Sequence, residues 1–150
     1  MFNISTIGAL KIQVSPQDLS YILNVDTTFN QTYIKAIVTY FYRKINFNSF
    51  RYQNGEIVKT IDGAGLKLKG FYTRTLQKKG WNLKFNAFSK DKLFGLKKAG
   101  LKGIDTSFAK NLLINDYLRS MNVPGSRSGY LSLFTPSLTF SASFVFGSTL

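Results

Sequence analysis

The chain has 150 residues, with 20 Lys and Arg against 7 Asp and Glu, and therefore a net charge of +13. It contains no cysteine and no histidine, which excludes disulfide scaffolds, zinc ribbons, thiol nucleophiles and serine–histidine–aspartate catalysis. Hydrophobic residues make up 44% of the sequence and aromatic residues 15%, which is enough to build a core in a single domain of this length.

The N-terminal third predicts a strand, a short helix and a longer strand. The first strand is expected over residues 7–14, and Ser15, Pro16 and Asp18 then have the side chains that begin and cap a helix. Over residues 33–44, β-branched and aromatic side chains alternate with polar ones, which predicts a long strand. Residues 1–10 lack a basic segment followed by a long apolar run, so we expect neither a secretory signal nor a transmembrane anchor there.

The middle of the chain predicts short strands separated by polar connections. An Asn-rich connection is expected over residues 45–55, and a short strand over residues 56–61. The two glycines within residues 62–65 favour a turn, because glycine adopts positive φ without steric cost, and a strand over residues 66–69 follows. Residues 81–88 alternate between apolar and polar side chains, as in a strand with one side in the core.

The last third predicts one substantial helix. Residues 91–103 read as a Lys- and Gly-rich loop, residues 107–121 as the helix and residues 128–134 as a strand. The helix has an apolar stripe at helical spacing: Phe108, Leu112, Leu113, Tyr117, Leu118 and Met121. The predicted fold class is α+β, a twisted and mainly antiparallel sheet with one main helix. Residues 1–134 form the main part, and the uncharged residues 135–150 a divergent tail.

Positive charge is concentrated on the strands and turn around residue 70. The densest cluster comprises Lys67, Lys69, Arg74, Lys78, Lys79 and Lys84. Phe71, Tyr72 and Trp81 lie among these cations in the sequence. Such a surface attracts phosphate, and aromatic rings suit base stacking, so nucleic acid and nucleotide phosphate are both candidate ligands. A solvated surface without a ligand is the remaining alternative.

Three segments, taken in order, are similar to the spore coat protein CotH kinase-like family. Residues 66–74 (LKLKGFYTR) resemble that family's strand ending in Arg-Gly, and residues 78–85 (KKGWNLKF) its Lys-Lys strand. Residues 101–130 resemble its helix and the closing Val-Pro turn. The resemblance extends from about residue 10 to residue 134 and implies an atypical protein-kinase-like fold.

The resemblance also implies ATP and Mg²⁺ as cofactors and phosphoryl transfer to Ser or Thr of a protein partner. Lys79 and Lys84 would neutralise charge on ATP, Gly70 and Thr73 would line the phosphate loop, and Arg74 would contact phosphate. Because some family members are spore-coat or cell-surface proteins, the resemblance implies a protein substrate and a location of that kind.

The chain departs from the family in its basic residues and in its C-terminal end. Lys69 stands where the family has arginine, and lysine lacks the bidentate fork that holds phosphate rigidly. The family's second half, with its metal-binding and catalytic aspartates, has no counterpart here, and the 7 acids form no local cluster. We therefore expect no metal site and no kinase activity from this chain alone, and no catalytic residue is assigned. A nucleic-acid or polyanion-binding module and a non-catalytic cell-surface adhesion protein remain alternatives.

Overall fold

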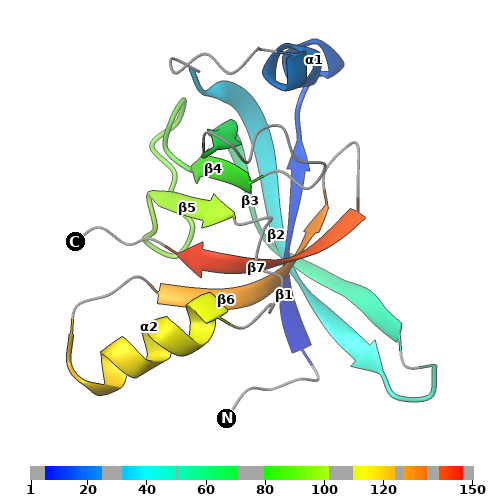
Figure 1. Ribbon diagram of the computed structural model, residues 1–150. Helices are drawn as coiled ribbons and strands as arrows, with labels where there is room; N and C mark the ends of the chain where they lie inside the picture. The colour runs from blue at the N-terminus through cyan, green and yellow to red at the C-terminus, as the bar shows by residue number, and fades with distance from the viewer. Residues whose placement is uncertain are drawn as a thin grey trace.

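A computed structural model gives the structure of the chain, and Figure 1 shows its strands and helices. It describes residues 6–24, 32–49, 51–70, 80–101, 110–123, 127–134 and 139–146. Within these residues the molecule is mainly β, with seven strands and two short helices. The expected antiparallel sheet is confirmed, whereas helix takes a smaller share than an α+β fold implies.

The first five strands form an antiparallel sheet in chain order: β1 (Thr6–Gln13), β2 (Ile34–Asn46), β3 (Arg51–Lys69), β4 (Gly80–Lys84) and β5 (Lys98–Leu101). The remaining two, β6 (Arg127–Phe134) and β7 (Thr139–Phe146), pair with each other as antiparallel neighbours. β6 pairs in parallel with β1, and β7 pairs with β5, so this pair connects the two edges of the five-stranded sheet (Figure 1).

One side of the sheet supplies the hydrophobic core. Two cross-strand rows of β3, β4 and β5 belong to it: Leu66–Leu83–Ala99 and Leu68–Trp81–Leu101. β1, β2 and α1 add further buried residues, among them Leu10, Ile12, Ile22, Ala36 and Val38. The alternation expected for the β4 segment is confirmed, because its Trp and Leu are buried while the residues between them are partly exposed.

The first helix, α1 (Pro16–Asn24), begins where the sequence predicts. Ser15 Oγ accepts a hydrogen bond from the Asp18 N–H at 3.1 Å and donates one to the Asp18 carboxylate at 2.7 Å. The first bond satisfies an N–H group that the helix itself leaves without a partner, and the carboxylate lies at the positive end of the helix dipole. The expected cap is confirmed.

The second helix, α2 (Lys110–Ser120), ends in a Schellman-type cap. The Val123 N–H donates to the Leu118 carbonyl at 2.9 Å, and the Asn122 N–H donates to the Arg119 carbonyl at 3.0 Å. Asn122 has a φ of 56°, in the left-handed region that asparagine tolerates better than most residues.

The apolar stripe of α2 does not pack as expected. Tyr117 is 65% exposed, and Leu113 and Met121 are exposed as well, while Leu118 is partly buried. The predicted helix start and the side chains of Phe108 and Leu112 lie outside the described part of the chain. Neither of the two described helices is long and apolar enough to cross a membrane.

The prediction of separate short strands between residues 45 and 69 is wrong. β2 continues to Asn46, and a single strand, β3, runs from Arg51 to Lys69. Residues 47–49 form a turn within a short connection, in which Asn46 Oδ1 accepts the Asn48 N–H at 2.9 Å. The expected Asn-rich connection of residues 45–55 is therefore mostly strand.

The residues expected to form a turn at 62–65 form a β-bulge within β3. The register passes from Ala36 opposite Ala64 to Ile37 opposite Asp62, so Gly63 has no direct partner on β2. Gly63 has a φ of 101°. A bulge of this kind and a turn both need a residue that tolerates positive φ, which is why the same sequence suits either.

The predicted loop of residues 91–103 contains a strand, and the predicted strand of residues 81–88 is shorter than expected. β4 ends at Lys84, and β5 occupies four residues of the loop. Before β5, Leu93 and Leu96 exchange backbone hydrogen bonds of 3.2 and 2.8 Å around a tight turn. β5 has only four residues, and two of them are lysine and glycine. The alternation of buried and exposed residues is therefore too short to recognise in the sequence.

Candidate functional site

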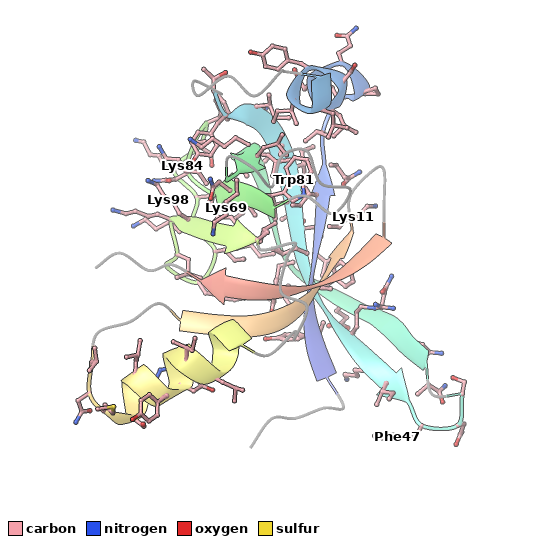
Figure 2. All side chains as sticks on the ribbon, in the orientation of Figure 1. Lys11, Phe47, Lys69, Trp81, Lys84 and Lys98 are labelled. Carbon is pink, nitrogen blue, oxygen red and sulfur yellow. The ribbon has the colours of Figure 1, made fainter. Side chains whose placement is uncertain are left out.

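The strand register gathers four lysines on the side of the sheet opposite the core. Lys67 and Lys69 of β3 alternate with core leucines, as does Lys84 of β4, and Lys98 of β5 lies opposite Lys84. We call this surface the lysine face and define it by Lys67, Lys69, Lys84 and Lys98. Figure 2 shows Lys69, Lys84 and Lys98 together at β3, β4 and β5. Residues far apart in the sequence thus form one positively charged surface.

Small residues separate these lysines. Gly65 lies opposite Lys84, and Gly80 lies opposite Lys69. Gly100 is two residues after Lys98 on β5 and so lies on the same side of the strand. Gly65 and Gly80 are nevertheless buried, and at Gly65 the side chains of Tyr33 and Ala87 cover the position that a Cβ atom would occupy.

Tyr33 extends the lysine face at the start of β2. The Lys67 Nζ lies 4.7 Å from the centroid of the Tyr33 ring, and the Lys84 Nζ lies 5.9 Å from it. Both distances are within the range of cation–π attraction. Burial raises the pKa of the Tyr33 hydroxyl above its usual value.

An ion pair and a groove border this surface at β2. Lys35 lies opposite Gly65, and its Nζ is 3.2 Å from the Asp62 carboxylate. Beside this pair is a groove with a volume of about 360 Å³ between the start of α1 and strands β2 and β3. It is lined by Gln13, Val14, Ser15, Asp18, Lys35, Ala36, Ile37 and Asp62. Two carboxylates thus lie next to a surface that otherwise consists of cations.

The residues predicted to bind the cofactor fall into two groups. Lys84 belongs to the lysine face, and Gly70 ends β3 with a φ of 82°. The expected pairing of the flanking strands is confirmed, because the residues before and after the connection 70–79 lie opposite each other. Thr73, Arg74 and Lys79 lie outside the described residues.

One aromatic candidate for base stacking is wrong. Trp81 is 8% exposed and packs in the core between β3 and β5, so its ring faces cannot stack on a base (Figure 2). Phe71 and Tyr72, the other two candidates, lie outside the described residues.

No three acidic side chains come together in the ranges that the structure describes. The lysine face suits the phosphate groups of a nucleotide and not a divalent cation.

Tyr33 and Lys98 were missed by the sequence prediction. Neither lies in the basic cluster around residue 70. Lys98 reaches the lysine face through the pairing of β5 with β4, and Tyr33, just before β2, through its contacts with Lys67 and Lys84. No protein-family model matches the chain, and no curated protein matches it significantly in sequence. Function therefore has to be inferred from the surface itself.

Proposed function

We propose that this chain corresponds to the nucleotide-binding N-terminal part of a CotH kinase-like protein. The observation that supports the proposal is the lysine face, in which Lys69 directly precedes Gly70 at the end of β3. In kinase-like proteins a turn between paired strands covers the phosphates of ATP, and a strand lysine neutralises their charge. We assign these roles to Gly70, at the end of β3, and to Lys84, at the opposite end of β4, and Thr73, Arg74 and Lys79 complete the proposed site.

The proposal covers binding and not phosphoryl transfer. Transfer requires acidic side chains that hold the metal and orient the acceptor hydroxyl, and we assign no residue of this chain to these roles. A protein substrate of the spore coat or cell surface, which the resemblance implies, belongs to the same proposal.

Equilibrium binding of labelled ATP, with and without Mg²⁺ and at two salt concentrations, tests the proposed function. We expect Mg²⁺-dependent binding that weakens at least about tenfold in Lys84→Ala and in Lys79→Ala, because each variant removes a charge next to phosphate. The control is Lys11→Ala, which removes an exposed lysine from β1, outside the lysine face.

Two results would contradict this function. If ATP did not bind, the nucleotide-binding function would be wrong. If ATP bound equally well with and without Mg²⁺ and lost affinity with salt alone, the surface would be a polyanion-binding one. If Lys11→Ala weakened binding as much as Lys84→Ala, binding would depend on net charge and not on the lysine face.

A further inference from the structure

Tyr33 is held in place by the absence of a side chain at residue 65. A Cβ atom added to Gly65 would lie 2.9 Å from both Cβ and Cδ1 of Tyr33 and 2.6 Å from Cβ of Ala87. Such contacts are too short for any side chain, so only glycine permits this packing. The tyrosine ring therefore lies against the backbone of β3, in the middle of the lysine face.

The ring in turn fixes the two ammonium groups beside it. Lys67 and Lys84 come from neighbouring strands, and both Nζ atoms lie within 6 Å of the ring centroid. A lysine side chain normally samples many rotamers, and ordering it costs conformational entropy. Contact with the Tyr33 ring reduces that cost before a ligand arrives, so the two charges are preorganised.

Neither Lys67 nor Lys84 forms an ion pair with a carboxylate of the described residues, whereas Lys35 on the same side of the sheet pairs with Asp62. Both ammonium groups lie within 6 Å of the same ring centroid, so an anion that contacts both gains the attraction of two positive charges.

We propose that Lys67, Lys84 and Tyr33 form a phosphate clamp, in which the two ammonium groups bind one phosphoryl group and the tyrosine ring positions them. Lys67 and Lys84 are the binding residues, and Tyr33 is a positioning residue. The clamp names the residues of the proposed site that would bind phosphate. It rests on the proposed function if the phosphoryl group belongs to a nucleotide. Its chemistry is the same for a free polyphosphate.

Calorimetric titration with tripolyphosphate, ATP and adenosine, at constant ionic strength, tests the clamp. We expect tripolyphosphate and ATP to bind and adenosine not to bind. Lys67→Gln and Lys84→Gln should each weaken tripolyphosphate binding about tenfold, because each removes a charge-assisted hydrogen bond. The matched control Lys35→Gln removes a lysine from the same side of the sheet and should change the affinity less than about twofold, because this exposed lysine is paired with Asp62, lies outside the clamp and acts on it only through screened solvent.

Two substitutions of Tyr33 separate positioning from folding. Tyr33→Phe keeps an aromatic ring and should bind tripolyphosphate as the natural chain does, whereas Tyr33→Leu should bind about threefold more weakly, because it removes the cation–π contacts. NMR spectra of ¹⁵N-labelled lysine ammonium groups provide a second measurement. Tripolyphosphate should shift the signals of Lys67 and Lys84 together and leave that of Lys35 in place.

The clamp and the nucleotide function fail in different ways. If ATP bound with Mg²⁺ dependence but Lys67→Gln and Tyr33→Leu bound it normally, the clamp would be wrong and the nucleotide function would stand. If tripolyphosphate binding depended on all three residues but Mg²⁺ had no effect on ATP binding, the clamp would stand without the nucleotide function. Equal weakening by Lys35→Gln and Lys84→Gln would overturn the clamp.

Discussion

Tyr40 is the described residue with the most strongly perturbed acid–base behaviour. Its ring contacts Tyr42 and Phe94 edge-on, at centroid distances of 5.4 and 5.1 Å. The pKa of the Tyr40 hydroxyl is raised well above the usual 10.0. Burial is the largest cause, and the hydrogen bond with Tyr42 and the negative charge of ionised Tyr42 add to it. The folded protein therefore keeps this hydroxyl protonated at a pH at which the unfolded chain loses the proton.

This difference predicts a loss of stability at alkaline pH. The contribution of Tyr40 is fully present below pH 10.0 and is lost as the pH rises from there towards the raised pKa of the folded protein. Over that range the free energy of unfolding should fall by up to about 1.4 kcal/mol per pH unit, the slope for one proton. Urea unfolding of the natural chain and of Tyr40→Phe measures this difference.

The comparison with Tyr40→Phe is needed because lysines also titrate at alkaline pH. The variant lacks the hydroxyl, so its stability should fall less steeply above pH 10.0 than that of the natural chain. Equal slopes for the two proteins would show that Tyr40 ionises at its ordinary pKa.

At this scale the sequence predicts part of the candidate site. Lys84 and Gly70 were predicted, because a basic strand and a turn glycine are recognisable in the local sequence. Tyr33 was not, because its role depends on the pairing that brings β2 next to Gly65 of β3. A cross-strand contact of this kind leaves no local pattern.

Among the elements, β3 shows best where sequence patterns fail. Its bulge at Gly63 packs against the segment after β4, where the Phe88 N–H donates to the Gly63 carbonyl at 2.8 Å. A Cβ at Gly63 would lie 3.1 Å from that of Ser89. Both the positive φ and this close approach require glycine there.

Substitution of Gly63 should therefore destabilise the protein through two separate effects. Gly63→Ala should lower the free energy of unfolding by about 2 kcal/mol, through backbone strain and close contact together. The control is Gly95→Ala, where φ is also positive at 80° but a Cβ would meet no atom within 4 Å. Strain alone should cost that variant about 1 kcal/mol.

Urea unfolding of these two variants measures both costs. If Gly95→Ala lost as much stability as Gly63→Ala, the close contacts at the bulge would contribute nothing. The positive φ of Gly63, which the predicted turn at residues 62–65 would also require, would then account for the whole loss of stability.

The elements with an uninterrupted local pattern were the easiest to predict. The first strand, α1 with its Ser15 cap and the strand that became β2 all have patterns that extend over several residues. β5 was not predicted, because a four-residue strand cannot show periodicity. The α2 stripe predicted amphipathicity, but not that Tyr117 would remain exposed.

For the molecule as a whole, a net charge of +13 should make stability depend on salt. Like charges repel each other in the compact state, and added salt screens them. We expect the melting temperature to rise by a few degrees, roughly 3 °C, between about 20 mM and about 300 mM NaCl.

A double variant locates the repulsion. Lys67→Gln combined with Lys84→Gln removes two adjacent charges of the lysine face, so its melting temperature should depend less on salt than that of the natural chain. A melting temperature that fell with salt in the natural chain would mean that attractive ion pairs outweigh repulsion.

The parallel pairing of β1 with β6 has a consequence for the order of folding. Gly8 lies beside Leu131, so this contact encloses most of the chain in one loop. Each pairing among β1 to β5, by contrast, joins two strands that follow each other in the sequence. Closing a long loop costs more entropy and is slower than forming a hairpin. A folding molecule would therefore pass through a stage in which the outer edges of β1 and β5 are both unpaired. Unpaired edges template association with other chains, so the danger of aggregation is greatest just before the last two strands join the sheet.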